Sequence, residues 1–461
     1  MGVDRRRQVL TEGRSMGGPD GVDASTAGPP RGVRTRAFRR LWWSWTVSLL
    51  GDGVRGLALP LYVAVQTRSP LAASAVTTAE VLPWLLCALP AGAIVDRARP
   101  TVVLAVAHAF RAVATAGLVL SIVYHVATVP LLCAFAFVLT VAETFAYSAS
   151  QALLVSLAGP DQLNEANAKF YTVHTVGLNL AGPLAAGALF TIGPALAFAL
   201  DGVTFLTAAV LVAGLPSTQR APNAPAPKRP HRLTAEIREG VALLFRMNGL
   251  RVLVAMIATA TLAVSAVNAL TPLYAVRQLR MPPGWVSALL VVGALGALLG
   301  TRLAVPAARR WSEGKVMVLS MATMAGGMIL FGTFALVPTA LAANVVLGVG
   351  IGGWNVLAAA RRQRITPPSA MGRISGAYRM LAWGLMPVGA AVAGPLAVAT
   401  SLGTVFVILG VFILVVLAIL ARSLLRSETA VPAQRAGPPT GAEVAAPSPS
   451  QAQPRPADSA N

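Results

Sequence analysis

Apolar residues occur in twelve long segments separated by short polar turns. Each segment has about 20 residues or more, the length that a helix needs to cross a hydrocarbon layer of roughly 30 Å. The apolar residues cover every face of these segments, whereas a surface helix of a soluble protein carries a single apolar stripe. The pattern predicts an all-α membrane protein. Its predicted spans are residues 41–66, 72–95, 101–123, 129–150, 168–190, 194–214, 250–276, 285–305, 315–334, 338–360, 375–398 and 402–422.

The first six and the last six spans are related by an internal repeat. Leu59–Pro70 read LPLYVAVQTRSP, and Thr271–Pro282, 212 positions later, read TPLYAVRQLRMP. Six of these twelve pairs are identical, and the same offset relates Gly182–Ala185 to Gly394–Ala397. One offset over this distance indicates two structural halves joined end to end. We therefore expect twelve transmembrane helices in two parallel-repeat six-helix halves, with a substrate site between the halves.

Polar segments flank and separate the two halves. Residues 1–37 contain no apolar run, so we expect a disordered cytoplasmic tail and not a cleaved signal peptide. The two predicted bundles cover residues 38–215 and 250–424. Between them, residues 216–249 contain a Pro-rich stretch and an amphipathic pattern, which predict a cytoplasmic linker with a surface helix. Residues 425–461 are rich in Pro, Ala and Ser and predict a second disordered cytoplasmic tail.

The basic residues indicate an orientation in the membrane. The formal net charge is +20, but the bases lie in turns between spans, and no compact basic domain is present to bind nucleic acid. If both termini are cytoplasmic, the predicted outer turns contain only Arg68, Arg277 and Arg280 as bases, as the positive-inside rule requires. Arg far outnumbers Lys, which is typical of a GC-rich genome and favours a bacterial cell membrane as the location.

Six charged residues lie well inside predicted spans of the first half, and the predicted spans of the second half contain no Asp or Glu. Burying an unpaired carboxylate in a membrane costs roughly 2.5–3.5 kcal/mol on insertion scales, so burial favours the protonated acid. Because four acids accompany two Arg, we expect the excess acids to gain and lose protons. A structural ion pair or a hydrogen bond to the backbone is the alternative role for each single residue. The six residues are Asp52, Arg55, Glu80, Arg111, Glu143 and Asp201.

The turn after the second predicted span carries a motif of Gly92, Asp96, Arg97 and Leu104. This motif resembles the G-x-x-x-D-R-x-G-R-K-x-x-L signature of the major facilitator superfamily. Arg99 stands in place of the second Gly of the signature, and Pro100 and Thr101 stand in place of the two following bases. The resemblance implies the major facilitator fold, in which this Asp meets the N-terminal end of the eleventh helix and acts as a conformational latch.

Other residues are similar to the branch of that superfamily that contains macrolide and enterobactin exporters. They include Gly51–Gly53 in the first span, Ala142–Phe145 in the fourth and Phe198–Asp201 in the sixth. In the fifth span, a group of residues resembles the glycine–proline motif of antiporters, with its upstream glycine displaced by one position. This group consists of Gly182, Pro183 and Gly187. The resemblance implies exchange of a drug for a proton.

Five residues of the second half are candidates for the lining of an adaptable substrate cavity. Helix packing is the alternative role for each of them. They are Tyr274, Asn268, Trp354, Asn355 and Met380. The four His are scattered, and Cys87 and Cys133 have no ligand spacing, so we expect no metal site and no cofactor. The absence of a G-x-x-x-x-G-K-[ST] motif excludes ATP as the direct energy source.

These patterns predict an exporter of small amphipathic molecules, such as drugs or antibiotics, that works by proton antiport and alternating access. The expected partners are a small-molecule substrate, protons and the lipid bilayer, and the chain is expected to be monomeric. A dedicated exporter of a siderophore or of a self-made natural product is one alternative. A polytopic membrane enzyme is another, but it requires catalytic groups clustered at one interface, and the sequence has no such cluster.

Overall fold

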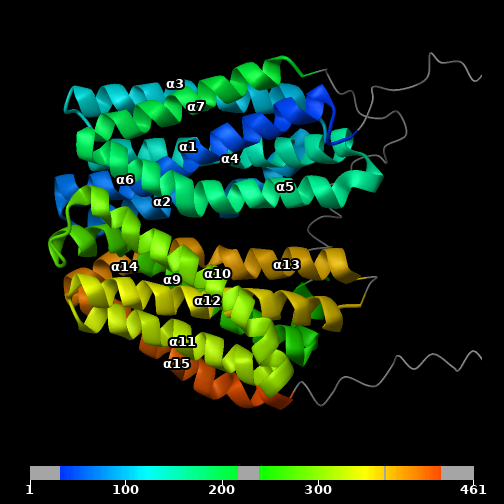
Figure 1. Cartoon of the computed structure of the whole chain (residues 1–461), viewed down its shortest axis with the longest axis vertical. Helices are drawn as coiled ribbons and strands as arrows, with labels where there is room; N and C mark the ends of the chain where they lie inside the picture. The colour runs from blue at the N-terminus through cyan, green and yellow to red at the C-terminus, as the bar shows by residue number, and fades with distance from the viewer. Residues whose placement is uncertain (1–31, 216–237, 240, 368–369, 427–461) are drawn as a thin grey trace, which may run out of the picture.

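The computed structural model describes residues 32–215, 238–239, 241–367 and 370–426. Within this part of the chain, twelve helical segments are long and apolar enough to cross a membrane. The six segments nearest the N-terminus lie together in one half, and the other six lie together in the second half (Figure 1). The predicted all-α membrane fold with two six-helix halves is therefore confirmed.

The first half begins with α1 and ends with α7. The segments α5, η3 and α6 follow one another without a turn and together form the fifth span, in which η3 is a short π-helix. The elements are α1 (Arg36–Thr67), α2 (Pro70–Val95), α3 (Pro100–Val123), α4 (Val129–Ala158), the 3-10 turn η2 (Pro160–Gln162), α5 (Leu163–Val176), η3 (Gly177–Ala181), α6 (Gly182–Ile192) and α7 (Pro194–Ala213).

The second half begins with α9 and ends with α15. Here the eleventh span consists of α13 and α14, which meet at Leu385. The elements are α9 (Asn248–Arg277), the 3-10 turn η4 (Pro283–Trp285), α10 (Val286–Trp311), α11 (Glu313–Thr333), α12 (Val337–Ile365), α13 (Met371–Gly384), α14 (Met386–Ala399) and α15 (Leu402–Arg426).

Both halves pack their helices in the same order. In the first half, α1 packs on α7, α2 packs on α4, and α3 packs on both α4 and α7. In the second half, α9 packs on α15, α10 packs on α12, and α11 packs on both α12 and α15. The packing repeats from one half to the other, as the offset of 212 residues in the sequence predicts.

Several helices extend past the predicted spans. The helix α4 continues to Ala158, although the apolar pattern ends at residue 150, and α12 continues to Ile365 instead of residue 360. Hydropathy detects only the part of a helix that lies in hydrocarbon, whereas a helix can project into the polar interface. The 32 residues of α1 correspond to a length of about 48 Å.

The fifth span contains a break that brings it close to α1. Pro183 has no backbone N–H, so the regular α-helical hydrogen bond is missing there, and the preceding residues Gly177–Ala181 form the π-helix. A Cβ atom on Gly53 would overlap the carbonyl oxygen of Gly177, and a Cβ atom on Gly182 would overlap the backbone of Gly53. Glycine at these positions therefore permits the contact that fixes α1 against the fifth span.

Small residues also bring α10 and α12 together. Each helix carries two glycines four positions apart, Gly296 and Gly300 on α10 and Gly348 and Gly352 on α12. A Cβ atom on any of them would overlap backbone atoms of the other helix. In a membrane, where apolar side chains gain nothing by leaving water, such close packing is a main source of helix association.

The two halves meet at one end of the molecule. We call the end that carries Arg36 and Arg426 the terminal end and the opposite end the distal end. At the distal end, the hydroxyl of Ser74 on α2 donates a hydrogen bond to the carbonyl oxygen of Ala390 on α14 and accepts one of 3.0 Å from the backbone N–H of Gly394. Hydrogen bonds between the halves, in the described part of the chain, lie at this end. The structure is therefore closed at its distal end.

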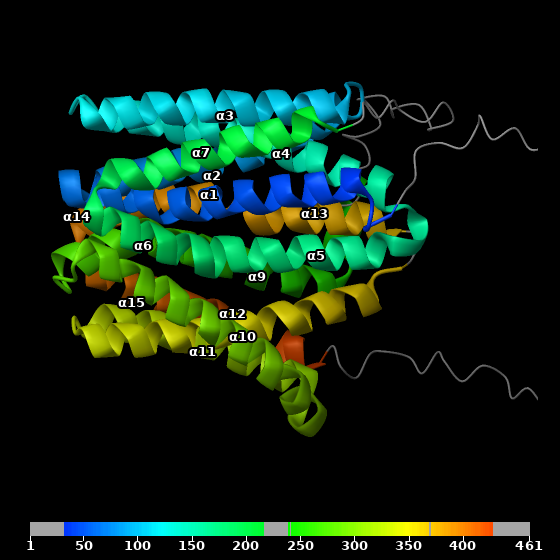
Figure 2. The ribbon, with the colours of Figure 1, turned by 45° about the horizontal axis from the view of Figure 1, so that its top comes forward.

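The remaining domain predictions fall mostly outside the described residues. Residues 1–31 and 427–461 of the predicted tails and residues 216–237 of the predicted linker are not described. Residues 238–239 and 241–246 are helical, and Leu244 is buried against the second half. The most buried span of each half is its first one, α1 or α9. Figure 2 shows α1 between α7 and α6, and it packs on both.

Candidate functional site

Two arginines and three acids meet halfway along four helices of the first half. Arg55 on α1 lies at the centre: its Nη1 is 3.0 Å from Oε1 of Glu80 on α2, and its Nη2 is 2.6 Å from Oε2 of Glu143 on α4. The same Nη2 lies 3.3 Å from Oδ1 of Asp52, one turn earlier on α1. One guanidinium group thus contacts three carboxylates.

Arg111 on α3 joins the same group from the other side. Its Nη2 donates a hydrogen bond to Oδ1 of Asp52 and lies 3.7 Å from Oε2 of Glu143. Its guanidinium group is also stacked 3.8 Å from the centre of the Phe205 ring on α7. We call Asp52, Arg55, Glu80, Arg111 and Glu143 the charge network.

The charge network is buried, but two of its acids reach the surface. Arg111 and Arg55 are 0 % and 3 % exposed, and the side chain of Asp52 is 5 % exposed, whereas those of Glu80 and Glu143 are 17 % and 20 % exposed. Two arginines cannot neutralise three ionised acids, so the network carries an excess negative charge when all of its members are ionised. Glu80 and Glu143 are the members that an ion or a proton can reach.

Asp201 on α7 lies beside the network without joining it. Its side chain is fully buried, and neither carboxylate oxygen has a hydrogen-bond partner within the described residues. Its Oδ1 is 2.5 Å from the position that a Cβ atom on Gly51 would take, so the glycine beside Asp52 makes room for this carboxyl group. The hydroxyl group of Thr115 on α3 is another buried polar group without a hydrogen-bond partner among the described residues.

Aromatic residues next to the charge network were not predicted from the sequence. Trp84 and Tyr147 follow Glu80 and Glu143 by four residues, so each lies one helical turn further towards the terminal end. Their rings are in edge contact, with 5.6 Å between centroids, and Tyr147 is 37 % exposed. Trp45 on α1 extends this aromatic surface, with 5.7 Å between its ring and that of Tyr147. The spacing of four residues after each acid was the signal available in the sequence.

The predicted substrate-cavity residues of the second half fall into two groups. Tyr274 is fully buried, donates a hydrogen bond of 2.8 Å to the carbonyl oxygen of Phe331, and is packed among aromatic rings. Trp354 is also buried. In this conformation both residues pack between helices, which was their alternative role. Asn268, Asn355 and Met380 are exposed, and their contribution to a cavity stays a prediction.

The predicted latch residues lie at the terminal end. Gly92 is on the last turn of α2, and its carbonyl oxygen accepts a hydrogen bond of 2.9 Å from the backbone N–H of Asp96. The side chains of Asp96, Arg97 and Arg99 are exposed. Among the described residues, Asp96 forms neither an ion pair nor a side-chain hydrogen bond, so the predicted contact with the eleventh span is not made in this conformation.

The predicted antiporter motif serves two different contacts. Gly182 and Pro183 shape the π-helical break against α1, as described above. Gly187 lies nearer the distal end, where a Cβ atom on it would lie 2.5 Å from both the carbonyl oxygen of Gly284 and Oγ of Ser287 in the second half. Gly187 therefore belongs to the distal contact between the halves.

No metal centre is found in the part of the chain that the structure describes. No group of three or more His, Cys, Asp or Glu side chains there is arranged to hold an ion. Cys87 and Cys133 are free thiols. The five members of the charge network are paired with one another.

This arrangement, two repeated six-helix halves around a charge network at mid-membrane, agrees with a comparison with known protein families. The sequence profile described as Major Facilitator Superfamily matches residues 41–388, a range that includes the entire charge network. The chain belongs to the major facilitator superfamily. It is a multi-pass membrane transporter of this superfamily and not an enzyme.

Two known members of the superfamily align with most of the chain. An uncharacterized MFS-type transporter of Sinorhizobium fredii, y4rN, is 26 % identical over 378 residues, which cover 79 % of this chain and 89 % of y4rN. The multidrug efflux pump Tap of Mycolicibacterium fortuitum is 27 % identical over 370 residues, which cover 78 % of this chain and 88 % of Tap.

Solved structures of the superfamily share the fold. The crystal structure of the nucleoside transporter NupG superposes with a TM-score of 0.68 at 15 % sequence identity, and the superposition covers 84 % of this chain and 98 % of that chain. At this low identity the likeness shows the fold alone.

The contacts of Arg55 generate a test of the charge network. Arg55→Gln leaves three buried acids without their shared partner, whereas Glu80→Gln removes one acid that has a single partner. We expect Arg55→Gln to destabilise the protein by about 3–5 kcal/mol, the range for breaking a buried ion pair on one side, and Glu80→Gln to cost much less. Thermal unfolding of the purified protein in detergent compares the two variants.

A double variant gives the control. Adding Glu143→Gln to Arg55→Gln removes one of the unpaired acids, so the double variant should be more stable than the sum of the two single losses, by about 0.5–3 kcal/mol. Equal stability of Arg55→Gln and Glu80→Gln, together with additive effects in the double variant, would contradict the network.

Proposed function

We propose that this transporter exports small amphipathic molecules, including lipophilic cations, in exchange for protons. The observation that carries the proposal is the charge network, in which three acids share two arginines at mid-membrane. Ionisable groups at that depth are expensive to bury, and they mark ion and proton pathways in membrane proteins. Proton coupling by alternating access requires a titratable group that is reached from one side of the membrane at a time.

The excess acid lets a proton and a cationic substrate compete. Glu143 contacts both arginines and is 20 % exposed, so it is held in place yet accessible. A proton on Glu143 removes the excess negative charge and weakens the attraction for a cation. A cation beside Glu143 favours the ionised carboxylate and expels the proton. By linkage, each ligand lowers the affinity for the other, which is the condition for antiport.

Asp201 is the second candidate proton carrier. An ionised carboxylate buried without a hydrogen-bond donor costs several kcal/mol, whereas the neutral acid costs far less. Because both oxygens of Asp201 lack partners among the described residues, we assign a proton to it in this conformation. Arg111 stacks on Phe205, one turn along α7 from Asp201, so a small shift between α3 and α7 would bring a guanidinium group to Asp201 and release that proton.

The aromatic surface beside the acids supports the substrate class. Trp84 and Tyr147 present ring surface next to Glu80 and Glu143. Aromatic faces attract cations and apolar ring systems alike, so a molecule with an apolar body and a positive charge can contact rings and carboxylates together. The likeness to the efflux pump Tap, at 27 % identity, supports the same substrate class.

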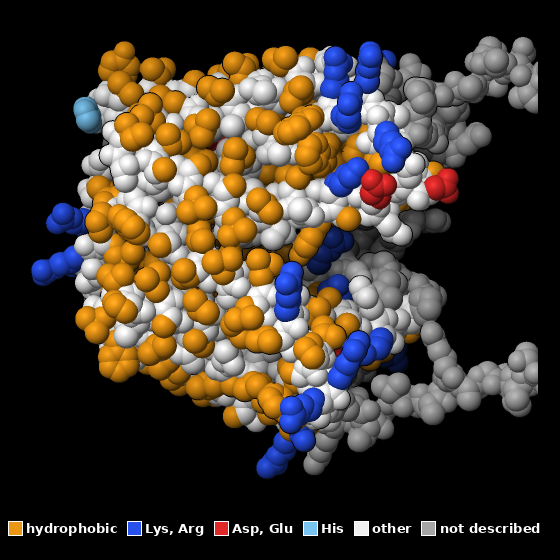
Figure 3. All heavy atoms as spheres, viewed as in Figure 1, with side chains coloured by type: hydrophobic (Ala, Val, Ile, Leu, Met, Phe, Trp, Pro, Cys, Tyr) orange, Lys and Arg blue, Asp and Glu red, His pale blue; other side chains and the backbone are white. Residues whose placement is uncertain are grey.

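The distribution of charge supports a cytoplasmic terminal end. Lys and Arg side chains gather at the end of the molecule where α1 begins and α15 ends (Figure 3), and positive residues favour the cytoplasmic side of a membrane. A structure closed at its distal end is then closed towards the outside, so it represents an inward-facing state. In this orientation Arg36, at the start of α1, and Arg426, at the end of α15, lie on the cytoplasmic side of a bacterial cell membrane.

A transport assay in inverted membrane vesicles tests the proposal. The vesicles are energised, and uptake of a fluorescent lipophilic cation is measured for Asp52→Asn and Glu143→Gln. We expect both variants to lose at least about 90 % of the accumulation, because one missing titration step prevents coupling, while downhill exchange of the cation persists. A protonophore should abolish accumulation by the unchanged protein.

Glu165→Gln is the matched control. Glu165 on α5 is an exposed acid paired with Lys169 at 2.8 Å, far from the network, and its substitution should leave accumulation unchanged. Full accumulation in both Asp52→Asn and Glu143→Gln would remove the network from the coupling mechanism. Growth on an imported nutrient without any change in drug tolerance would overturn the direction and the substrate class.

We further propose that Asp96 acts as a latch in the opposite, distal-open state. In the present state its side chain has no partner within the described residues. Closure of the terminal end would bring it to the N-terminal end of the eleventh span, where the helix dipole favours a negative charge by up to ~1 kcal/mol. The latch therefore stabilises the distal-open state.

Asp96→Asn tests the latch with a defined sign. The variant loses up to ~1 kcal/mol of stabilisation of the distal-open state. The ratio of distal-closed to distal-open molecules should therefore rise by up to about fivefold. Distances between spin labels on the terminal ends of the two halves report this population. Asp161→Asn, at another exposed acid of the terminal end, is the control. Equal distance distributions in both variants and the unchanged protein would exclude the latch.

A further inference from the structure

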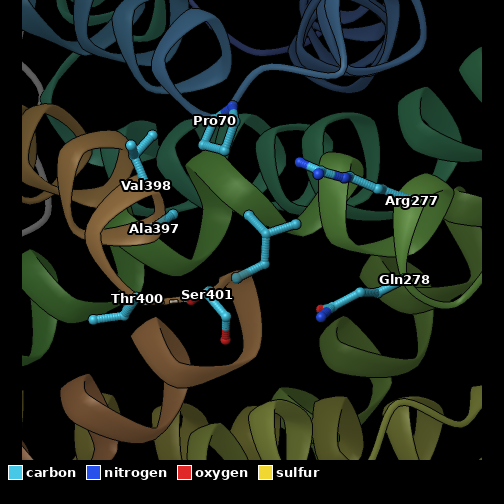
Figure 4. A pocket seen from close by; sticks show the side chains of 8 residues that line it. Pro70, Arg277, Gln278, Ala397, Val398, Thr400 and Ser401 are labelled. Carbon is cyan, nitrogen blue, oxygen red and sulfur yellow. Dashed lines mark hydrogen bonds between the residues drawn. The ribbon is translucent and has the colours of Figure 1, made fainter.

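A small polar cavity, open on one side, lies beside the distal contact between the halves. Its volume is about 360 Å³, within the range of small-molecule sites. Pro70 of the first half lines one wall, and Arg277, Gln278, Thr400 and Ser401 of the second half line the others (Figure 4). We call this space the distal cavity.

The polar groups of the distal cavity are suited to an anion. Arg277 supplies a guanidinium group, Gln278 an amide and Ser401 a hydroxyl group, and in Figure 4 the side chains of Arg277 and Gln278 extend into the cavity from the wall opposite Ser401. Ser401 also precedes the first residue of α15, and its Oγ accepts a hydrogen bond of 3.1 Å from the N–H of Thr404. The positive end of the α15 dipole therefore adds to the charge of Arg277.

Nothing nearby neutralises this charge. Among the described residues, Arg277 forms no ion pair; its Nη1 lies 3.5 Å from the carbonyl oxygen of Arg68, which is a long contact. None of the described Asp and Glu residues lies in a distal turn, whereas Arg68 and Arg280 do. Basic residues are disfavoured on the outer side of a membrane protein. We therefore expect a cluster of arginines on that side to have a function.

One wall of the cavity, at Pro70, is present only while the halves are together at the distal end. Pro70 and the backbone of Arg68 come from the first half, and the polar side chains come from the second. The hydrogen bonds of Ser74 with Ala390 and Gly394 lie on the same two helices, α2 and α14, that line the cavity. A ligand that contacts both Pro70 and the second half binds the distal-closed state better than the distal-open state. Its binding therefore shifts the population towards the distal-closed state.

We propose that the distal cavity binds a phosphate group and that its occupancy favours the distal-closed state. A guanidinium group, an amide, a hydroxyl group and a helix N-terminus match the several acceptor oxygens of phosphate. The phosphate belongs either to the headgroup of an anionic lipid of the outer leaflet or to free inorganic phosphate. The proposal rests on alternating access and on the orientation given above, but not on the coupling of protons.

The test uses the full chain with spin labels across the distal face. Val126→Cys and Leu336→Cys place one label on an exposed distal turn of each half, in a background with Cys87→Ser and Cys133→Ala. The protein is placed in nanodiscs of phosphatidylcholine alone, of phosphatidylcholine with phosphatidylglycerol, or of phosphatidylcholine with inorganic phosphate in the buffer. The labels report the fraction of molecules that are closed at the distal end.

We expect phosphatidylglycerol, inorganic phosphate or both to raise the distal-closed fraction, and the arm that responds identifies the source. Arg277→Gln should raise the ligand concentration that gives the half-maximal response by about tenfold, as expected for the loss of one charge-assisted hydrogen bond. Arg277→Lys should retain part of it. Arg280→Gln removes a charge from the same turn without touching the cavity, so it should respond like the unchanged protein.

Two results would contradict the proposed phosphate site. One is a distal-closed fraction that changes with neither phosphatidylglycerol nor phosphate. The other is an equal loss of response in Arg277→Gln and Arg280→Gln, which would indicate surface charge alone. Because distances are measured without transport, a negative result here leaves proton-coupled export untouched, and a failed transport assay leaves the cavity untouched.

Discussion

The rest of the structure depends on keeping two guanidinium groups buried among three carboxylates at the middle of the membrane. Arg55 cannot lie there without Glu80 and Glu143, and Arg111 cannot lie there without Asp52, since each unpaired charge would cost several kcal/mol. The network therefore ties α1, α2, α3 and α4 into one unit. In the proposed mechanism its excess acid responds to protons and to cations, so the same interaction that holds the first half together also supplies the chemistry for coupling.

Close backbone contacts hold the helices in the positions that the network requires. Gly53 lets α1 approach the π-helical break at Gly177, and Gly51 makes room for Asp201 beside Asp52. In the second half, which has no Asp or Glu at mid-membrane among the described residues, glycines on α10 and α12 let the two helices pack closely. The first half thus carries the buried charges, and the second half is held together by close packing. Ser74 and Gly187 join the two at the distal end.

The spans, the repeat and the six embedded charges could be predicted from the sequence. The length of an apolar segment and the presence of a charged residue within it are both read directly from the order of residues. The pairing of those charges could not, since it depends on the rotation of four helices relative to one another. The spacing of Asp52 and Arg55 at i and i+3 allowed one ion pair as an alternative role, and in the structure Arg55 contacts Glu80 and Glu143 as well. The cavity expected around Tyr274 and Trp354 is packed in this state, whereas aromatic surface lies beside the acids at Trp84 and Tyr147. Amino-acid type alone does not distinguish a ring that packs from one that lines a site.

The most direct test of the account is a measurement of protons released when a substrate binds. Purified protein in weakly buffered detergent solution is mixed with a lipophilic cation, and a pH-sensitive dye reports the change. If a proton and a cation compete at the charge network, binding should release about one proton per molecule bound, and Glu143→Gln should bind the cation with less release or none. Binding of the cation without any release of protons across the neutral pH range would contradict proton antiport at this site.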